Sequence, residues 1–177
     1  RSMESKTVLN FGVQVPDWYK GYVNAVDGAD FLKILEEQLE TTPSFLKNIT
    51  AEKWDFAYAP EKWTIKQLII HLTDAERVFA YRALRFARND ATELAGFEEN
   101  DYAANCMSEL RTPDSIIHEY IAVRSATITL FESFNEDVLM RKGISNGKEF
   151  SVGLLGVVMT GHQIHHMNIL SERYLKP

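Results

Sequence analysis

Four segments of the chain place apolar residues at the spacing of an amphipathic helix. They span about residues 28–48, 65–89, 113–134 and 152–174. The second is the most regular, whereas a run of β-branched residues weakens the helical preference of the third. Pro43 falls inside the first segment, where a proline is expected to kink or end a helix. The pattern therefore predicts four helices.

Three of these segments begin with residues that favour a helix N-terminus. Thr64 and Gln67 form a predicted capping box, in which each side chain accepts a hydrogen bond from the other residue's backbone N–H. Thr112 is a predicted cap before Pro113, and proline suits the first helical position because its missing N–H would be unpaired there. Ser151 is the predicted cap of the last helix.

The regions between the helices include a tight turn and a long connection. Asn146-Gly147 is typical of a β-hairpin turn, so we expect a short hairpin before the last helix. The connection of residues 91–111 is long for a bundle, and such connections are often functional or packed over the mouth of a site. Four amphipathic helices without a convincing long strand indicate an all-α four-helix bundle with a long connection between helices 2 and 3.

The composition adds limits on size and on partners. The chain has 177 residues, of which 45% are hydrophobic and 25% are charged, as in an ordinary globular domain. The net charge of −6 argues against a nucleic acid or a membrane surface as partner, because both are bound mainly through Lys and Arg. Arg1 and Ser2 precede Met3 and look like residues left by cloning, so the predicted single domain spans residues 3–177.

The cysteine count and the N-terminal segment favour the cytoplasm. Cys106 is the only cysteine, so neither an intramolecular disulfide nor a Cys-rich structural zinc site can form. The N-terminus mixes Glu4 and Lys6 with few apolar residues, unlike a secretory signal. No apolar stretch reaches the roughly 20 residues that a membrane span needs. We therefore expect a cytoplasmic protein.

The histidines are the strongest candidates for chemistry. The chain contains His71, His118, His162, His165 and His166. His162 and His166 are four residues apart, so their imidazoles project from one face of the last helix. His71 lies on a helix that packs into the same bundle. Three such imidazoles can bind one divalent transition metal at nitrogen–metal distances of about 2.0–2.1 Å.

Spacing alone leaves alternatives open. His165 is also within reach of His162, and a histidine on an apolar face is often only a hydrogen-bonded core residue. A histidine pair near a helix C-terminus can also interact with the helix dipole alone. Asp74 could orient a ligand histidine or be a surface acid beside an arginine, which we favour. Gln163 stands where the H-E-x-x-H motif of zincins has its general base, which argues against a metalloprotease.

The remaining polar and aromatic groups are interpreted as structural. An arginine stripe on the second helix consists of Arg82, Arg85 and Arg88. It either pairs with the acidic residues at positions 98, 99 and 101 or, as we favour, faces solvent. Cys106 could line a site mouth, but a lone cysteine is more often inert. The aromatic residues expected to pack the start of the second helix are Trp54, Tyr58 and Trp63.

Several runs of the sequence together resemble a known family. They are YAPEKWTIKQL from Tyr58, HLTDAERVFAYRALRFAR from His71, the acidic stretch from Gly96 to Tyr102, and GHQIHHMNILSERYL from Gly161. These runs resemble the DinB-like superfamily, in particular its YfiT-like branch of metal-dependent hydrolases. The resemblance covers nearly the whole chain. Its two histidine motifs are fairly specific together and weak apart.

The resemblance implies more than the spacing does. It implies a bundle with up-down-down-up connections, often as a homodimer, and a nickel or zinc ion held by the first-motif histidine and the H-x-x-x-H pair. Those ligands fall on His71, His162 and His166, which leaves His165 as a neighbour. The name DinB refers to a DNA-damage-inducible gene and implies no DNA binding.

A three-histidine site would leave one coordination position open, as in catalytic zinc sites. Two reactions then fit: hydrolysis of an ester or amide, and transfer of a low-molecular-weight thiol to a small-molecule substrate, which the resemblance alone implies. The sequence offers no convincing dedicated base. The alternative is a protein that binds a metal or small ligand without turnover.

Overall fold

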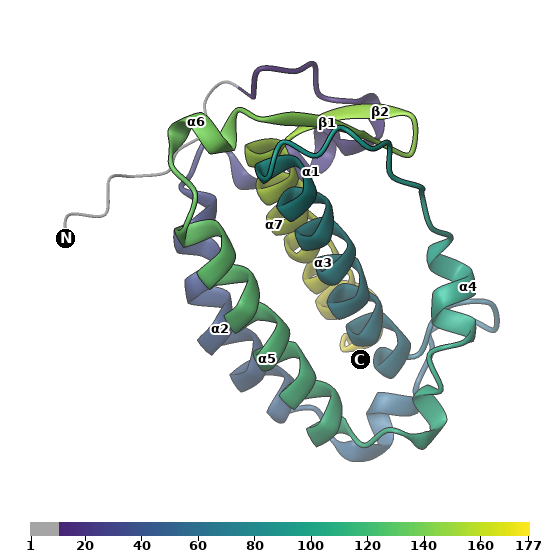
Figure 1. The fold of residues 1–177 in the computed structure, drawn as a ribbon. Helices are drawn as coiled ribbons and strands as arrows, with labels where there is room; N and C mark the ends of the chain where they lie inside the picture. Colours follow the sequence, from purple (N-terminus) through teal and green to yellow (C-terminus); the bar gives the residue numbers. More distant parts are fainter. Residues whose placement is uncertain (1–10) are drawn as a thin grey trace.

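The computed structural model describes residues 11–177, in which four long helices form a bundle (Figure 1). They are α2 (Phe31–Lys47), α3 (Ile65–Ala87), α5 (Pro113–Glu132) and α7 (Val152–Ile169). Helices α2 and α7 run in one direction, and α3 and α5 run in the other. This is the up-down-down-up order, and it confirms the predicted fold class. The predicted domain start at residue 3 and the segment with Glu4 and Lys6 lie outside the described residues.

The predicted caps begin the helices. The Thr64 hydroxyl accepts from the backbone N–H of Gln67 at 3.2 Å, and the Gln67 side chain accepts from the N–H of Thr64 at 2.9 Å. The Thr112 and Ser151 hydroxyls each accept from the backbone N–H three residues later, both at 3.1 Å. Local hydrogen bonding therefore fixes where α3, α5 and α7 begin.

The first long helix ends close to the predicted residue 48, whereas the last helix differs from the expectation. Pro43 is buried within α2, and the helix continues past it to Lys47, so the proline does not end the helix. The last helix was expected to run unbroken to Tyr174, but after α7 the chain winds more widely as a π-helix, Leu170–Tyr174. Such wide turns inside or after α-helices are often found near functional sites.

Short elements cover one end of the bundle (Figure 1). They are α1 (Lys20–Val26), α6 (Glu136–Leu139), and a hairpin of β1 (Lys142–Ser145) and β2 (Lys148–Ser151). Asn146 and Gly147 form the hairpin turn with φ of 49° and 73°, which confirms the predicted turn. The long connection begins at this end of the bundle, where its Leu94 pairs with Ser145 of β1 in an isolated parallel bridge.

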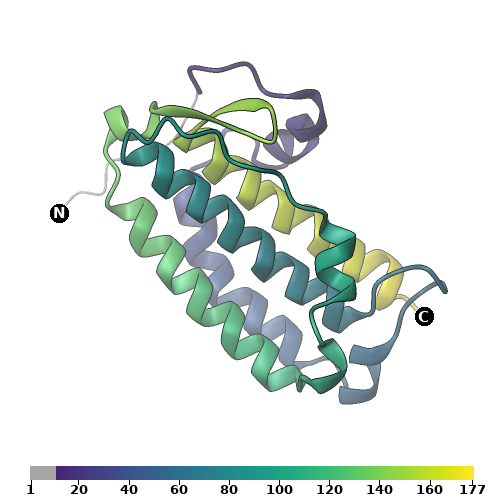
Figure 2. The ribbon, with the colours of Figure 1, turned by 45° about the vertical axis from the view of Figure 1, so that its right-hand side comes forward.

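The rest of the long connection follows the side of the bundle. Figure 2 shows it leaving the hairpin end and running along α3 to α4 (Glu99–Ala104). A 3-10 turn at Ser108–Leu110 then leads into α5. No helix within residues 11–177 is long and apolar enough to cross a membrane.

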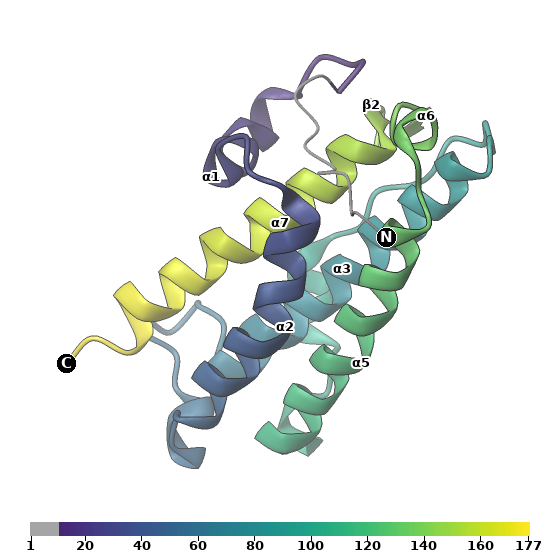
Figure 3. The same cartoon turned by 90° about the vertical axis from the view of Figure 1, so that its left-hand side faces the viewer.

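Helix α7 is the most enclosed element. It contacts α2 and α3 within the bundle, while α1 packs along its outer side (Figure 3). Apolar side chains form two clusters, one near the hairpin that includes Phe31, Phe131 and Phe150, and one near the other end that includes Trp54 and Leu170. Between the clusters lies a layer of buried polar residues, and this layer contains the histidines.

Candidate metal centre

Three histidines from two helices meet in the buried polar layer. His71 comes from α3, and His162 and His166 come from α7. The Nε2 atoms of His71 and His162 are 3.0 Å apart, and one ring nitrogen from each of the three residues lies within 4.8 Å of the others. His71 and His162 are buried and His166 is partly buried. The structure thus brings together the three residues that the resemblance selected.

The other two histidines lie elsewhere. His165 is exposed, and its ring packs edge-on against Tyr22 of α1 with centroids 5.5 Å apart. His118 is exposed on α5. Spacing had left His165 and His166 as equal candidates, and only His166 turns toward His71.

All three clustered histidines are neutral at neutral pH. Burial lowers the pKa of His71 to about 4. Burial and the neighbouring His71 and His165 lower the pKa of His166 to about 3. Burial and the adjacent rings also hold the pKa of His162 well below its usual range. Neutral imidazoles keep a lone pair free for a cation.

The donor set fits a divalent transition metal. In a tetrahedral site with bonds of about 2.0–2.1 Å, two ligand nitrogens stand roughly 3.3 Å apart. The 3.0 Å between the Nε2 atoms of His71 and His162 is close to that separation. The Nδ1 atom of His166 is buried and has no hydrogen-bond partner within the described part of the chain. Such an atom is rare unless something absent satisfies it.

Comparison with known proteins identifies the fold family. The model of the DinB superfamily matches residues 34–170 of the chain. The chain belongs to the DinB superfamily. Among solved structures, it is similar to YfiT from Bacillus subtilis, described as a probable metal-dependent hydrolase with an unusual four-helix bundle topology. The TM-score is 0.71 at 15% identity, over 80% of this chain and 82% of YfiT. No curated protein matches the chain.

Aromatic rings enclose the histidines of this DinB domain. The Trp63 ring lies 4.6 Å from the His71 ring and 6.3 Å from the His166 ring, measured between centroids. Tyr22 of α1 lies edge-on to His162 at 5.3 Å. Trp63 packs against the apolar cluster at the start of α3, as expected, and its ring also lies beside the site, which was not predicted. Tertiary packing places both rings beside the histidines, so no local pattern in the sequence predicts their positions.

One carboxylate also reaches the histidines of the DinB bundle. The Glu99 Oε2 atom, at the start of α4, lies 3.7 Å from His71 Nε2, and the side chain is half-exposed. Partial burial and the neighbouring Glu98 raise the pKa of the Glu99 carboxyl. From the residue pattern, position 99 was only a possible partner of the arginine stripe and not a candidate site residue. The acidic stretch between Gly96 and Tyr102, already part of the family resemblance, was the signal that could have found it.

A pocket of about 280 Å³ opens beside His71 and His162. The long connection forms one wall through residues 97–99, in agreement with the expectation that it packs over a site mouth. The other walls come from α1, α3 and the hairpin. The walls include Tyr19, Tyr22, Phe79, Arg82, Ser145 and Lys148.

The arginine stripe is not a solvated face, which corrects the favoured interpretation. Arg82 is 3% exposed and donates to the carbonyl oxygen of Ala95 at 3.1 Å. Arg85 is partly buried and pairs with Asp90. Only Arg88 is exposed. Helix α3 is covered here by the long connection, whose path the residue pattern did not reveal.

Two other candidates stay outside the candidate metal centre. Asp74 is partly buried in the field of Arg77 and Glu119, and burial raises the pKa of its carboxyl. This agrees with the favoured interpretation of an acid beside an arginine. The Cys106 thiol contacts the carbonyl oxygen of Ala103 at 3.2 Å and is not among the residues that line the pocket.

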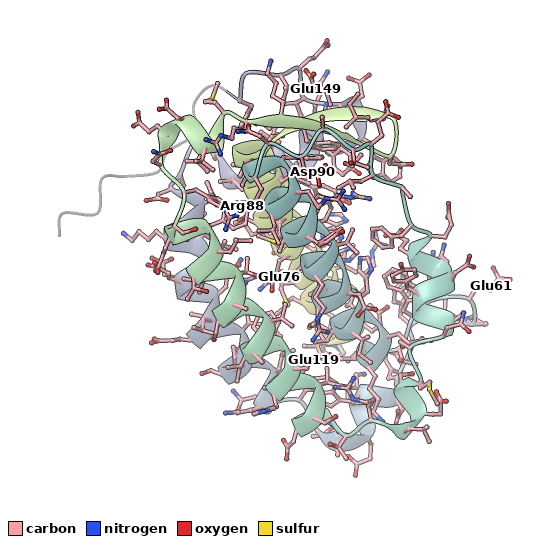
Figure 4. The ribbon with its side chains drawn as sticks, in the orientation of Figure 1. Glu61, Glu76, Arg88, Asp90, Glu119 and Glu149 are labelled. Atoms are coloured by element: carbon pink, nitrogen blue, oxygen red, sulfur yellow. The ribbon has the colours of Figure 1, made fainter. Side chains whose placement is uncertain are left out.

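A polar network beside the histidines joins all four helices. Arg124 of α5 donates to Glu76 of α3 at 2.6 Å, to the carbonyl oxygen of Leu35 of α2 at 3.2 Å, and to Gln163 of α7. Figure 4 shows Glu76 in the bundle interior between α3 and α5. Burial raises the pKa of the Glu76 carboxyl, and the Arg124 guanidinium opposes that shift. Gln163 directly follows His162, so the network also anchors the α7 turn that carries the site.

Proposed function

We propose that the protein binds one divalent transition metal through His71, His162 and His166 and hydrolyses a small-molecule ester or amide in the adjacent pocket. The observation that carries this proposal is the meeting of three neutral imidazoles within 4.8 Å beside a pocket of about 280 Å³. Nickel or zinc suits imidazole ligands. We also propose that the protein is cytoplasmic and forms a homodimer.

The chemistry divides between the metal and the chain. When bound, a divalent ion with an open position polarises a substrate oxygen and makes water a stronger acid. The chain supplies orientation and proton transfer. In the proposed reaction the water oxygen bonds to the carbonyl carbon, Glu99 accepts the water proton, and that proton passes to the leaving alcohol or amine as the ester or amide bond breaks.

The surroundings support this division of roles. Glu99 is the acidic side chain next to the histidines, with its Oε2 atom 3.7 Å from His71 Nε2. Trp63 and Tyr22 pack against the histidine rings and restrict water around them. A pocket of this size accepts a small molecule, and the acidic net charge argues against nucleic acid as substrate. The description of YfiT as a probable metal-dependent hydrolase agrees with the proposal.

Metal binding is tested with protein purified without a polyhistidine tag. After incubation with Ni²⁺ or Zn²⁺ and desalting, elemental analysis should find one metal ion per chain in the parent. His166→Ala should reduce this to a small fraction, because two imidazoles hold the ion weakly. His118→Ala changes an exposed histidine on α5 and should retain full loading. Lack of stoichiometric metal in the parent would refute the site.

Turnover is tested separately on the loaded protein. We expect a metal-dependent rate with generic esters or amides that His166→Ala abolishes and Glu99→Gln lowers roughly 100-fold, the range of general-base effects. Loading of the Glu99→Gln variant should stay stoichiometric. A metal-dependent rate only with a low-molecular-weight thiol and an electrophile would replace hydrolysis with thiol transfer. Full loading without any such rate would favour a non-catalytic metal-binding protein.

A further inference from the structure

Arg82 is a buried cation without an acidic partner. Its side chain lies in the wall of the pocket, and the residue is 3% exposed. Within residues 11–177, the one hydrogen bond of its guanidinium goes to the carbonyl oxygen of Ala95 at 3.1 Å. A guanidinium carries five N–H donors. A buried charge is rarely left unpaired, because removing it from water costs free energy that a counter-charge must offset.

The position of Arg82 relates it directly to the histidines. Residues 71, 75, 79 and 82 of α3 share one helical face, and all four line the pocket. The Cα–Cβ bonds of a helix tilt toward its N-terminus, and His71 lies in that direction from position 82. Its Cζ atom lies 5.8 Å from the Phe79 ring centre, and that ring lies 6.2 Å from the His162 ring centre. The Phe79 ring therefore neighbours both the cation and one histidine of the candidate metal centre.

A second unpartnered polar group belongs to a residue that lines the same pocket. The Ser145 hydroxyl, at the end of β1, is completely buried and has no hydrogen-bond partner among the described residues. Lys148 of β2 adds a second cation to the pocket wall. The spaces between these polar groups are filled by aromatic rings, including Tyr19, Phe79 and Phe97. Glu98 and Glu99 also line the pocket, and Glu99 lies next to His71. Arg82 bonds to Ala95 and Ser145 pairs with the neighbouring Leu94, so a guanidinium and a hydroxyl donor lie near one stretch of the long connection. This part of the pocket matches an organic anion better than a neutral ligand.

We propose that the pocket binds an organic carboxylate, with Arg82 as the anion receptor and the Ser145 hydroxyl as an additional donor. The planar guanidinium fork is suited to a carboxylate, which accepts two parallel hydrogen bonds. The rest of the ligand lies along Phe79 toward the histidines. Binding of the carboxylate does not depend on the metal. The further statement that the reacting ester or amide belongs to a molecule with a carboxylate at its far end rests on the proposed function.

A purely structural role for Arg82 makes different predictions. Its Cζ atom also lies 5.9 Å from the Phe97 ring, so the residue could only link α3 to the long connection. In that case its replacement would lower stability without changing anion binding. A binding measurement with a charged probe and an uncharged analogue separates the two roles.

The probes are 4-phenylbutyrate and its amide, 4-phenylbutanamide, which differ in charge but little in shape. Calorimetric titration at pH 7.5 uses protein that has been stripped of metal with a chelator and then desalted into metal-free buffer, so that the carboxylate cannot bind a metal ion and the chelator cannot compete with it. The parent should bind the carboxylate at least about tenfold more tightly than the amide, a difference of about 1.4 kcal/mol. Arg82→Gln should abolish this preference. Arg88→Gln, which removes an exposed cation from the same helix, should leave it unchanged.

Further variants allow the anion site to be tested even if Arg82→Gln does not fold. Circular dichroism and urea denaturation show whether Arg82→Gln folds. If it does not fold, Ser145→Ala, which removes an unpartnered hydroxyl, should still fold and weaken carboxylate binding several-fold. His166→Ala should lose metal loading and keep the preference for the carboxylate. Failure of the metal proposal can therefore be distinguished from failure of the anion proposal. The anion site is refuted if the parent binds neither probe, binds both equally, or if folded Arg82→Gln retains the preference.

Discussion

At Gly161, one residue before His162, the backbone of α1 approaches α7 very closely. A Cβ atom at this position would lie 1.9 Å from the carbonyl oxygen of Tyr22, a backbone atom that cannot move without shifting α1. Tyr22 in turn packs against the rings of His162 and His165. The absence of a side chain at Gly161 therefore allows α1 to cover the candidate metal centre.

We predict that Gly161→Ala destabilises the protein by about 1–3 kcal/mol, as overpacking commonly does, and weakens metal binding because α1 is displaced. The matched control is Gly21→Ala on α1, where an added Cβ meets nothing within 4 Å. Alanine there should stabilise by up to about 1 kcal/mol through helix propensity. Urea denaturation and metal titration measure both effects. Equal stabilities for the two variants would contradict the role assigned to Gly161.

For individual residues, the sequence predicted the candidate metal ligands better than it predicted the residues around them. His162 and His166 share a helix, so their spacing reveals a common face. The choice of His166 over His165 needed the family resemblance, since both positions are within reach of His162. Glu99 and Arg82 could not be assigned, because each acquires its environment from a contact between α3 and the long connection. Such contacts join segments that are separate in the sequence, so no periodic spacing of residues predicts them.

Among the elements, α7 shows that the burial of a helix cannot be predicted from the sequence of that helix alone. The apolar stripe predicted one buried face, but every residue from 152 to 163 is buried. The reason is α1, which covers the side of α7 that would otherwise face solvent. Helix α1 has seven residues, including Gly21 and Asn24, which is too short for helical periodicity to be detected. The four long helices, by contrast, carried both periodicity and recognisable caps.

The network around Arg124 joins the elements through buried polar contacts, and it predicts strong coupling. Arg124→Met leaves the Glu76 carboxylate buried without its cation, which should cost about 3–5 kcal/mol of unfolding free energy. The double variant Glu76→Leu with Arg124→Met removes both charges and should cost less than Arg124→Met alone. Urea denaturation of the parent, both single variants and the double variant gives the coupling energy. Additive single effects would show that the pair is not coupled.

At the scale of the whole molecule, the buried histidines couple folding to pH. In metal-free protein the folded-state pKa of His71 is about 4, below its ordinary value of 6.5. The unfolded chain therefore binds this proton more readily than the folded chain. His71 costs no stability at pH 7.5, where it is neutral in both states. The cost grows as the pH falls below 6.5 and stops growing near pH 4, where the folded state also takes the proton.

This linkage predicts that His71 contributes about 2 kcal/mol to the loss of stability between pH 7.5 and pH 5. His71→Gln cannot titrate, so its unfolding free energy in a chelator should fall by that much less than the parent's over the same interval. His118→Gln, which changes an exposed histidine, should follow the parent. Added Zn²⁺ or Ni²⁺ should raise the stability of the parent at pH 7.5, because the folded state alone offers the assembled site. If His71→Gln and the parent lost equal stability on acidification, the histidine would not be held neutral by the fold, and the same burial could not keep its lone pair ready for a cation.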